Sequence, residues 1–199
     1  MISQAEFFDS YAEKWDSMER PDICDLLDRV VRESGISAGM DILDVGTGTG
    51  VIIPCIQRAT NGDCNLRAID ISAGMLAIAR SKVNLPNVRF ELADIEDFDC
   101  PDCSFDAIIC NAVYPHFTNK SKVLSRIWSL LRPSGIIVVS HPTGREAVNK
   151  VHREASAVVT QDKVPTIEVM SFMLSAAGFT NISTTDEPEF YLAHAGKPH

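Results

Sequence analysis

The chain has 199 residues, of which 45% are hydrophobic and 23% are charged, and this composition is typical of a single globular domain with a full core. Its net charge of −9 comes from 27 acidic and 18 basic residues, a balance that disfavours nucleic-acid binders, which neutralise phosphates with clustered Lys and Arg. The sequence has no long apolar run and no apolar leader, so we expect a cytoplasmic protein without a membrane span.

The first predicted elements are helices within residues 1–35. Over residues 7–18, Tyr11 and Trp15 lie four positions apart, so their side chains share one helix face. The spacing alone is explained equally well by an apolar stripe on a surface helix.

A predicted strand over residues 41–45 leads into glycines at alternate positions, Gly46, Gly48 and Gly50. Glycine permits positive φ and lets a ligand approach the main chain, and the helix that follows offers unpaired N–H groups. The dinucleotide fingerprint G-x-G-x-x-G would place its third glycine where this chain has Val51. The spacing therefore disfavours a nicotinamide dinucleotide, and with it an oxidoreductase.

The second predicted strand, residues 66–69, ends at Asp70. A carboxylate at this place can accept hydrogen bonds from both hydroxyls of a ribose. Ser72 then caps a helix that carries Met75. The structural alternative for Asp70 is a carboxylate that stabilises the start of this helix.

Strands and helices alternate through the rest of the chain. Strands are predicted over residues 88–93, 107–110 and 136–140, and helices over residues 119–131 and 167–177. Two further extended pieces, 181–185 and 189–195, are joined at Glu187-Pro188. This order predicts an α/β fold with a doubly wound, mostly parallel sheet that closes with an antiparallel hairpin.

Three strings of the sequence resemble motifs of class I S-adenosylmethionine-dependent methyltransferases, in their small-molecule branch. They are D-V-G-T-G-T-G at 44–50, A-I-D-I-S-A-G-M-L-A-I-A-R at 68–80 and F-E-L-A-D-I-E-D-F at 90–98. The resemblance is specific over residues 40–141. It implies a Rossmann-like sheet of seven strands in one domain over 1–199, with lid helices in 1–35, a cofactor-binding core in 40–141, and acceptor-side helices and the final strand pair in 142–199.

The resemblance also implies S-adenosylmethionine as the cofactor, and each expected contact is assigned to a matching position. Asp44, the turn and the backbone at Asn111 are expected at the methionine end, and Asp70 at the ribose. Ile71 and Met75 would lie beside the adenine, whose amino group would donate to Asp94, with the Ile95 backbone at the ring edge. A solvated acidic loop is the alternative for Asp94. The full set comprises Tyr11, Asp44, Gly46, Thr47, Gly48, Gly50, Asp70, Ile71, Met75, Asp94, Ile95 and Asn111.

The acceptor is expected above the carboxyl ends of the strands, where open α/β sheets bind ligands. After Asn111, the presence of Ala112 and Val113 excludes the N-P-P-Y motif of enzymes that methylate amide or base nitrogens. The candidates for accepting a proton are Tyr114, His116 and His141. One face of a presumed helix carries Arg145, Asn149 and His152, and this face could hold an anionic acceptor.

These patterns predict methyl transfer from S-adenosylmethionine to a small-molecule acceptor, with S-adenosylhomocysteine as the product. The acceptor-side stripe is equally compatible with a solvated helix face. A non-catalytic S-adenosylmethionine-binding or regulatory subunit remains an alternative, and an oxidoreductase or an RNA methyltransferase is disfavoured. No metal site is expected, because the histidines show no fixed ligand spacing.

Overall fold

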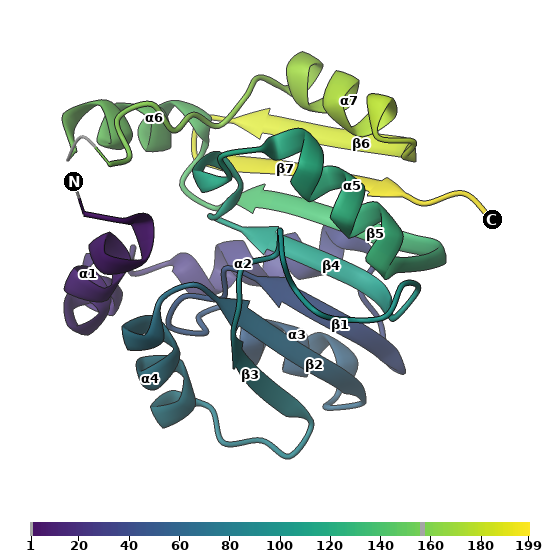
Figure 1. The fold of residues 1–199 in the computed structure, drawn as a ribbon, viewed down its shortest axis with the longest axis horizontal. Coiled ribbons are helices and arrows are strands. Elements are labelled where there is room, and N and C mark those ends of the chain that lie inside the picture. Colours follow the sequence, from purple (N-terminus) through teal and green to yellow (C-terminus); the bar gives the residue numbers. More distant parts are fainter. Residues whose placement is uncertain (1, 156–157) are drawn as a thin grey trace.

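The computed structural model describes residues 2–155 and 158–199, and its strands form one sheet (Figure 1). The sheet has seven strands in the order β3-β2-β1-β4-β5-β7-β6. The strands are β1 (Met40–Val45), β2 (Cys64–Asp70), β3 (Val88–Leu92), β4 (Phe105–Asn111), β5 (Leu131–His141), β6 (Thr180–Glu187) and β7 (Phe190–Gly196). The first five are parallel to one another, whereas β7 is antiparallel to both β5 and β6. The predicted fold class is confirmed.

The helices connect these strands in the alternating order that the sequence predicts. They are α1 (Gln4–Met18), α2 (Ile23–Ser34), α3 (Ile53–Thr60), α4 (Ala73–Lys82), α5 (Lys120–Leu130), α6 (Arg145–Glu154) and α7 (Ile167–Ala176), with a 3₁₀ turn, η1 (Tyr114–His116). Ser72 caps α4 as expected, because its side chain accepts from the N–H of Met75 at 3.0 Å.

Most predicted boundaries differ from the observed ones by one or two residues, and the start of β5 differs by more. The helix expected to end at residue 131 ends at Leu130, and β5 begins at once, before the Pro133-Ser134-Gly135 sequence. The register with β4 moves from Phe105–Leu131 to Ala107–Ile136, so the extra residues of β5 bulge out of the sheet. A bulge of this kind lets a strand contain turn residues without losing its pairing.

Consecutive strand residues point into two apolar layers on opposite faces of the sheet. Ile42 and Leu43 of β1 lie in different core clusters, as do Ile108 and Ile109 of β4. Helices α5 and α7 cover one face, and α2 and α3 cover the other (Figure 1). Both faces of the central strands are therefore buried, as a parallel sheet requires.

The two N-terminal helices have different roles in the fold. Leu27 and Val30 of α2 are fully buried in the core beside α3, so α2 is a core helix and not a lid. Helix α1 packs on α4 instead and lies beside the carboxyl ends of the parallel strands (Figure 1). Of the lid helices expected within residues 1–35, α1 alone has the position of a lid.

Candidate active site

The glycine turn connects β1 to α3 and leaves the main chain bare. Gly46, Gly48 and Gly50 have φ values of 67°, 56° and 79°, which side chains rarely adopt. A Cβ on Gly46 would lie 2.3 Å from Val113, whereas a Cβ on Gly48 would meet nothing within 4 Å. Gly46 therefore allows a close approach of two chain segments, and Gly48 faces open space.

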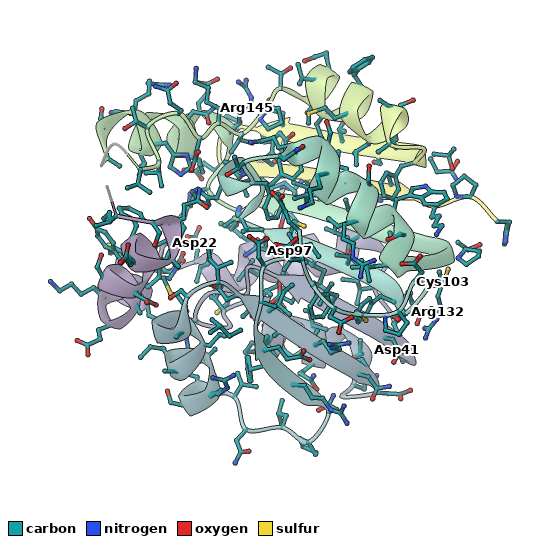
Figure 2. All side chains as sticks on the ribbon, in the orientation of Figure 1. Asp22, Asp41, Asp97, Cys103, Arg132 and Arg145 are labelled. Atoms are coloured by element: carbon teal, nitrogen blue, oxygen red, sulfur yellow. The ribbon has the colours of Figure 1, made fainter. Side chains whose placement is uncertain are left out.

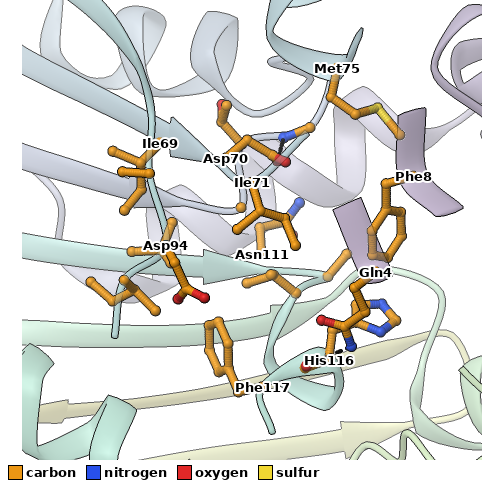
Figure 3. Close-up of a pocket in the computed structure, with 18 of the residues that line it drawn as sticks. Gln4, Phe8, Ile69, Asp70, Ile71, Met75, Asp94, Asn111, His116 and Phe117 are labelled. Atoms are coloured by element: carbon orange, nitrogen blue, oxygen red, sulfur yellow. Dashed lines mark hydrogen bonds between the residues drawn. The ribbon is translucent and has the colours of Figure 1, made fainter. Parts of the chain in front are cut away.

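That space belongs to a cavity of about 130 Å³, which we call the first chamber (Figure 3). Ten of the residues predicted to bind the cofactor or to act in catalysis line it: Gly46, Thr47, Gly48, Asp70, Ile71, Met75, Asp94, Ile95, Asn111 and His116. Figure 3 shows Asp70, Ile71, Asp94 and Asn111 around it, at or just beyond the ends of β2, β3 and β4. The sequence motifs thus meet in one cavity, because parallel strands bring their carboxyl ends to the same edge of the sheet.

Asp44 lies at the end of β1, and its side chain is almost fully buried. Neither of its carboxylate oxygens has a hydrogen-bond partner among the described residues, and the hydroxyl of the neighbouring Thr47 has none either. Burial raises the pKa of Asp44 to about 7, although the nearby Thr47 hydroxyl acts in the opposite direction. An unpaired buried carboxylate is costly, so this position fits a ligand that brings a cationic hydrogen-bond donor.

Asp70 is held by the backbone on both sides. One carboxylate oxygen accepts from the N–H of Gly48 at 2.8 Å, and the other accepts from the N–H of Ser72 at 2.8 Å. Burial raises the pKa of Asp70, while these N–H groups act in the opposite direction. Each oxygen keeps a second acceptor position, so the carboxylate can still receive ribose hydroxyls in the first chamber.

Helix α1 closes the first chamber from the side, but not through Tyr11. Tyr11 is not among the residues that line this chamber; Phe8 and Trp15 reach it instead. Phe8 and Trp15 lie seven positions apart, which is about two helical turns, so their side chains share one face of the helix. This spacing is the feature of the sequence that could have identified the inward-pointing face. Asp16 holds α1 against the rest of the protein, because its carboxylate accepts hydrogen bonds from Thr49 at 2.6 Å and from Lys82 at 2.7 Å.

Two other predicted contacts are displaced from the chamber wall. Asp44 lies beneath the turn rather than on the lining. Gly50 packs inward, where a Cβ would meet Ile53 at 3.3 Å and Ala79 at 3.4 Å, so its small size serves the packing of α3 on α4. Sequence reasoning also missed the residues that complete the lining: Gln4, Glu19, Val45, Thr49, Val51, Ile69, Ala93, Glu96, Ala112, Val113, Phe117 and Thr118.

A second chamber of about 490 Å³ adjoins the first beneath α1 and α6. The two chambers share Phe8, Trp15, Glu19, Val51, Asn111, Ala112 and His116. At this junction Ala112 adopts a φ of 56°, a strained conformation for a residue with a side chain. Side chains of α1 and α6, among them Phe7, Tyr11, Met18, Val148 and Val151, make most of the wall apolar.

Three histidines supply polar atoms to the second chamber. His116 comes from η1, His141 from the end of β5 and His152 from α6. His116 Nδ1 lies 2.7 Å from the Oδ2 atom of Asp162, and its ring centroid lies 5.0 Å from that of His152. His141 is buried, its Nε2 atom has no hydrogen-bond partner among the described residues, and burial lowers its pKa to about 3.

The prediction of Tyr114 as a proton acceptor is wrong. Its side chain is fully buried in the core cluster, packs on Phe117, and donates to the sulfur of Met173 at 3.7 Å. Burial raises the pKa of its hydroxyl, which opposes ionisation. Tyr114 lines neither chamber, because η1 turns it toward α7 while His116 points to the other side.

The stripe Arg145, Asn149 and His152 does not act as one face toward the second chamber. Only His152 lines it. Arg145, at the start of α6 (Figure 2), instead donates to Asp186 on β6 at 2.7 Å, and neither residue lines a chamber. Asn149 is buried and exchanges hydrogen bonds with the backbone of Val164, at 3.1 and 2.8 Å. Helical spacing placed the three residues correctly relative to α6, but it carried no information about their partners.

Within residues 2–155 and 158–199, no group of three or more His, Cys, Asp or Glu side chains is arranged to hold a metal ion. In the same part of the chain, no helix has the length and apolar character that a membrane crossing requires.

Known proteins resemble the chain in sequence. A family model described as "Methyltransferase domain" matches residues 36–185. The ubiquinone/menaquinone biosynthesis C-methyltransferase UbiE of a Marinomonas species is 30% identical, and the match covers 68% of this chain and 57% of that protein. The trans-aconitate 2-methyltransferase of Deinococcus radiodurans is 31% identical over 72% of this chain and 49% of its own length. The chain thus spans about half the length of these relatives.

Solved structures share the fold at lower identity. A S-adenosylmethionine-dependent methyltransferase of Aquifex aeolicus superposes with a TM-score of 0.73 at 21% identity, over 93% of this chain and 96% of that one. A chain from the complex between the Haloferax volcanii Trm112 methyltransferase activator and a putative methyltransferase gives 0.81 at 17% identity, over all of both chains. Because the family model covers more than half of the sequence, the chain belongs to the methyltransferase-domain family.

Proposed function

We propose that the protein transfers the methyl group of S-adenosylmethionine to a small-molecule acceptor and releases S-adenosylhomocysteine. The observation that carries the proposal is the unpaired, buried carboxylate of Asp44 beneath a bare glycine turn. The ammonium group of the cofactor's methionine end is a cationic donor of the kind this carboxylate lacks. The names of the relatives, which include methyltransferases of quinone biosynthesis and of trans-aconitate, support a small-molecule acceptor.

The residues of the first chamber fit the parts of this cofactor. Asp44 and the turn at Gly48 would hold the methionine end, and Asp70 would accept from the ribose hydroxyls. Ile71 and Met75 offer an apolar surface for the adenine, and Asp94 lines the same chamber. When bound, the cofactor supplies a methyl group on a sulfonium, whose leaving thioether needs little further activation.

The chain itself would then contribute mainly position and the exclusion of water. Phe8 and Trp15 of α1 lie over the junction of the two chambers, where an acceptor would meet the methyl group. Orienting two reactants in this way lowers a barrier by about 7–11 kcal/mol in favourable cases. The second chamber, which shares lining residues with the first, favours an enzyme over a non-catalytic cofactor-binding subunit, which needs no acceptor cavity.

An anionic acceptor loses its support in this structure. That expectation depended on Arg145, which is paired with Asp186 away from the second chamber. Val51 at the third glycine position and the net charge of −9 continue to disfavour a nicotinamide cofactor and an RNA substrate.

Isothermal titration calorimetry with S-adenosylmethionine, S-adenosylhomocysteine and NAD tests the proposal. We expect both sulfur compounds to bind, and at about a hundred times the dissociation constant to stabilise the fold by ~2.7 kcal/mol. Methyl transfer from labelled cofactor into a small-metabolite extract should follow. Binding of NAD alone would contradict the proposal, and cofactor binding with no transfer into any extract would favour the non-catalytic subunit.

A further inference from the structure

Asp162, which belongs to none of the predicted motifs, forms hydrogen bonds with two histidines of the second chamber. Its Oδ2 atom lies 2.7 Å from Nδ1 of His116, and its backbone carbonyl accepts from Nδ1 of His152 at 2.9 Å. His116 and Asp162 are separated by 46 positions in the chain and are brought together by the fold. Their side chains are only 11% and 17% exposed, so the pair is shielded from solvent.

Hydrogen bonds from α6 hold the segment that contains Asp162. Asn149 binds both the N–H and the carbonyl of Val164, two residues beyond Asp162. His152, one turn further along α6, binds the carbonyl of Asp162 itself. These bonds fix the position of the Asp162 carboxylate relative to η1, and they give Asn149 a structural role in place of the predicted contact with an acceptor.

This geometry determines which nitrogen of His116 is free. A carboxylate is an acceptor, so the Nδ1 atom of His116 donates to Asp162 and the lone pair of the neutral imidazole lies on Nε2. Among the described residues, no hydrogen bond to Nε2 of His116 is found. His116 also lines both chambers, so its ring lies at their junction.

The wall of the second chamber indicates what kind of molecule would meet this imidazole. Among the described residues that line it there is no Lys or Arg, and Glu19 is the one carboxylate. Burial lowers the pKa of both His141 and His152, which favours the neutral form of both rings. Aromatic and aliphatic side chains of α1 and α6 make up most of the remaining surface. The chamber therefore suits an uncharged, largely apolar molecule.

We propose, on the basis of the proposed function, that His116 is the general base of methyl transfer and that Asp162 is its positioning residue. The acceptor that binds in the second chamber is then an uncharged, largely apolar molecule whose nucleophile is a hydroxyl group. His116 Nε2 takes the hydroxyl proton as the acceptor oxygen bonds to the methyl carbon of S-adenosylmethionine. The carbon–sulfur bond breaks, and its electron pair stays on the sulfur of S-adenosylhomocysteine. Asp162 stabilises the imidazolium, which then returns its proton to water.

Nitrogen NMR of ¹⁵N-histidine-labelled protein tests the pair without any cofactor. We expect His116 to carry its proton on Nδ1 in the wild-type protein, and to lose this single tautomer in Asp162→Ala. Asp162→Asn preserves the shape of the side chain should the alanine variant unfold, and Asp63→Ala, on an exposed loop before β2, is the matched control. A wild-type His116 protonated on Nε2, or an unchanged tautomer in Asp162→Ala, would overturn the proposal.

Transfer of a labelled methyl group to 1-naphthol and to 1-naphthylamine tests the role of the base. The amine needs no base, whereas His116→Gln should lower kcat for the naphthol by about 10²–10⁴-fold. Asp162→Asn should lower the same kcat by at least about tenfold with little change in KM, since it acts through His116. An equal loss with both acceptors, or no transfer to 1-naphthol by a protein that binds S-adenosylhomocysteine, would overturn the proposal.

The charge preference is tested in the presence of saturating S-adenosylhomocysteine. We expect 1-naphthol to shift the NMR signals of His116 and His152, and 1-naphthoate to leave them unchanged. Tighter binding of the naphthoate would overturn the assignment of an uncharged acceptor. Failure of S-adenosylhomocysteine itself to bind would instead contradict the proposed function, so the two failures are distinguishable.

Discussion

The carboxylate of Asp70, at the end of β2, accepts a hydrogen bond from the backbone N–H of Gly48 at 2.8 Å. This bond joins the glycine turn of one strand to the acidic residue of the next, and the second oxygen of Asp70 joins the start of α4 through Ser72. Asp70 therefore shapes the first chamber in addition to facing it. A ribose bound there would meet a carboxylate whose orientation is already fixed.

Asp70→Ala should lower both stability and cofactor affinity. Each hydrogen bond to a charged group contributes about 1.5–3 kcal/mol, so loss of the ribose contacts should weaken S-adenosylhomocysteine binding by more than tenfold. The N–H groups of Gly48 and Ser72 lose their acceptors as well, which should lower the melting temperature. Calorimetry and thermal unfolding measure the two effects. A loss of affinity smaller than tenfold would mean that the ribose is held elsewhere.

Cofactor affinity should rise with pH through about 7, because of Asp44. Burial raises the pKa of this carboxyl from 3.8 to about 7, so the folded, ligand-free protein keeps a proton that the unfolded chain has lost. Between these values, stability falls as pH rises, since the unfolded state binds fewer protons. An ammonium group of the ligand favours the ionised carboxylate, so binding below pH 7 should release a proton. Calorimetry in buffers of different ionisation enthalpy measures this release.

Asp44→Asn is the control for this pH dependence. The amide does not ionise, so proton release should disappear and affinity should fall. At pH 8, where the wild-type carboxylate is buried and charged, the variant should gain on the order of 1–3 kcal/mol in unfolding free energy. An undiminished proton release in Asp44→Asn would show that another group titrates on binding.

Gly48→Ala should affect binding more than folding, and Gly35→Ala provides a matched comparison. Both glycines have positive φ, at 56° and 81°, and a Cβ would meet nothing within 4 Å at either position. Each substitution should therefore cost about 1–2 kcal/mol of stability for the left-handed conformation. Gly35 ends α2 away from the chambers, whereas the Gly48 Cβ would enter the first chamber. Equal affinities for S-adenosylhomocysteine in the two variants would show that the cofactor does not approach Gly48.

Trp15→Ala should weaken S-adenosylhomocysteine binding more than Tyr11→Ala does. Trp15 lines both chambers, while Tyr11 lines only the second and packs on Phe7 with a ring separation of 5.0 Å. Dissociation rates measured by stopped-flow fluorescence should show faster release in the tryptophan variant, because the cover over the junction is reduced. The reverse order of the two variants would restore Tyr11 as the cofactor contact.

The local sequence was sufficient to predict the sheet and most of the residues that line the first chamber. The patterns that predicted them are alternate glycines, acidic residues near the ends of the first three strands and continuous apolar runs. Each of these patterns involves only a few neighbouring residues. The parallel topology then brings Gly48, Asp70, Asp94 and Asn111 to the same edge without further information. The bulge in β5 was missed because the pairing with β4 overrides the turn preference of Pro133-Ser134-Gly135.

What the tertiary structure alone decided is which polar side chain meets which partner. Arg145 and Asp186 are 41 positions apart, and His116 and Asp162 are 46 apart, so no local spacing links them. Tyr114 and His116 are two residues apart in one turn, yet one is buried in the core and the other lies between the chambers. A helix or turn fixes the direction of a side chain relative to its own backbone, and only the packing of distant elements determines what that direction faces.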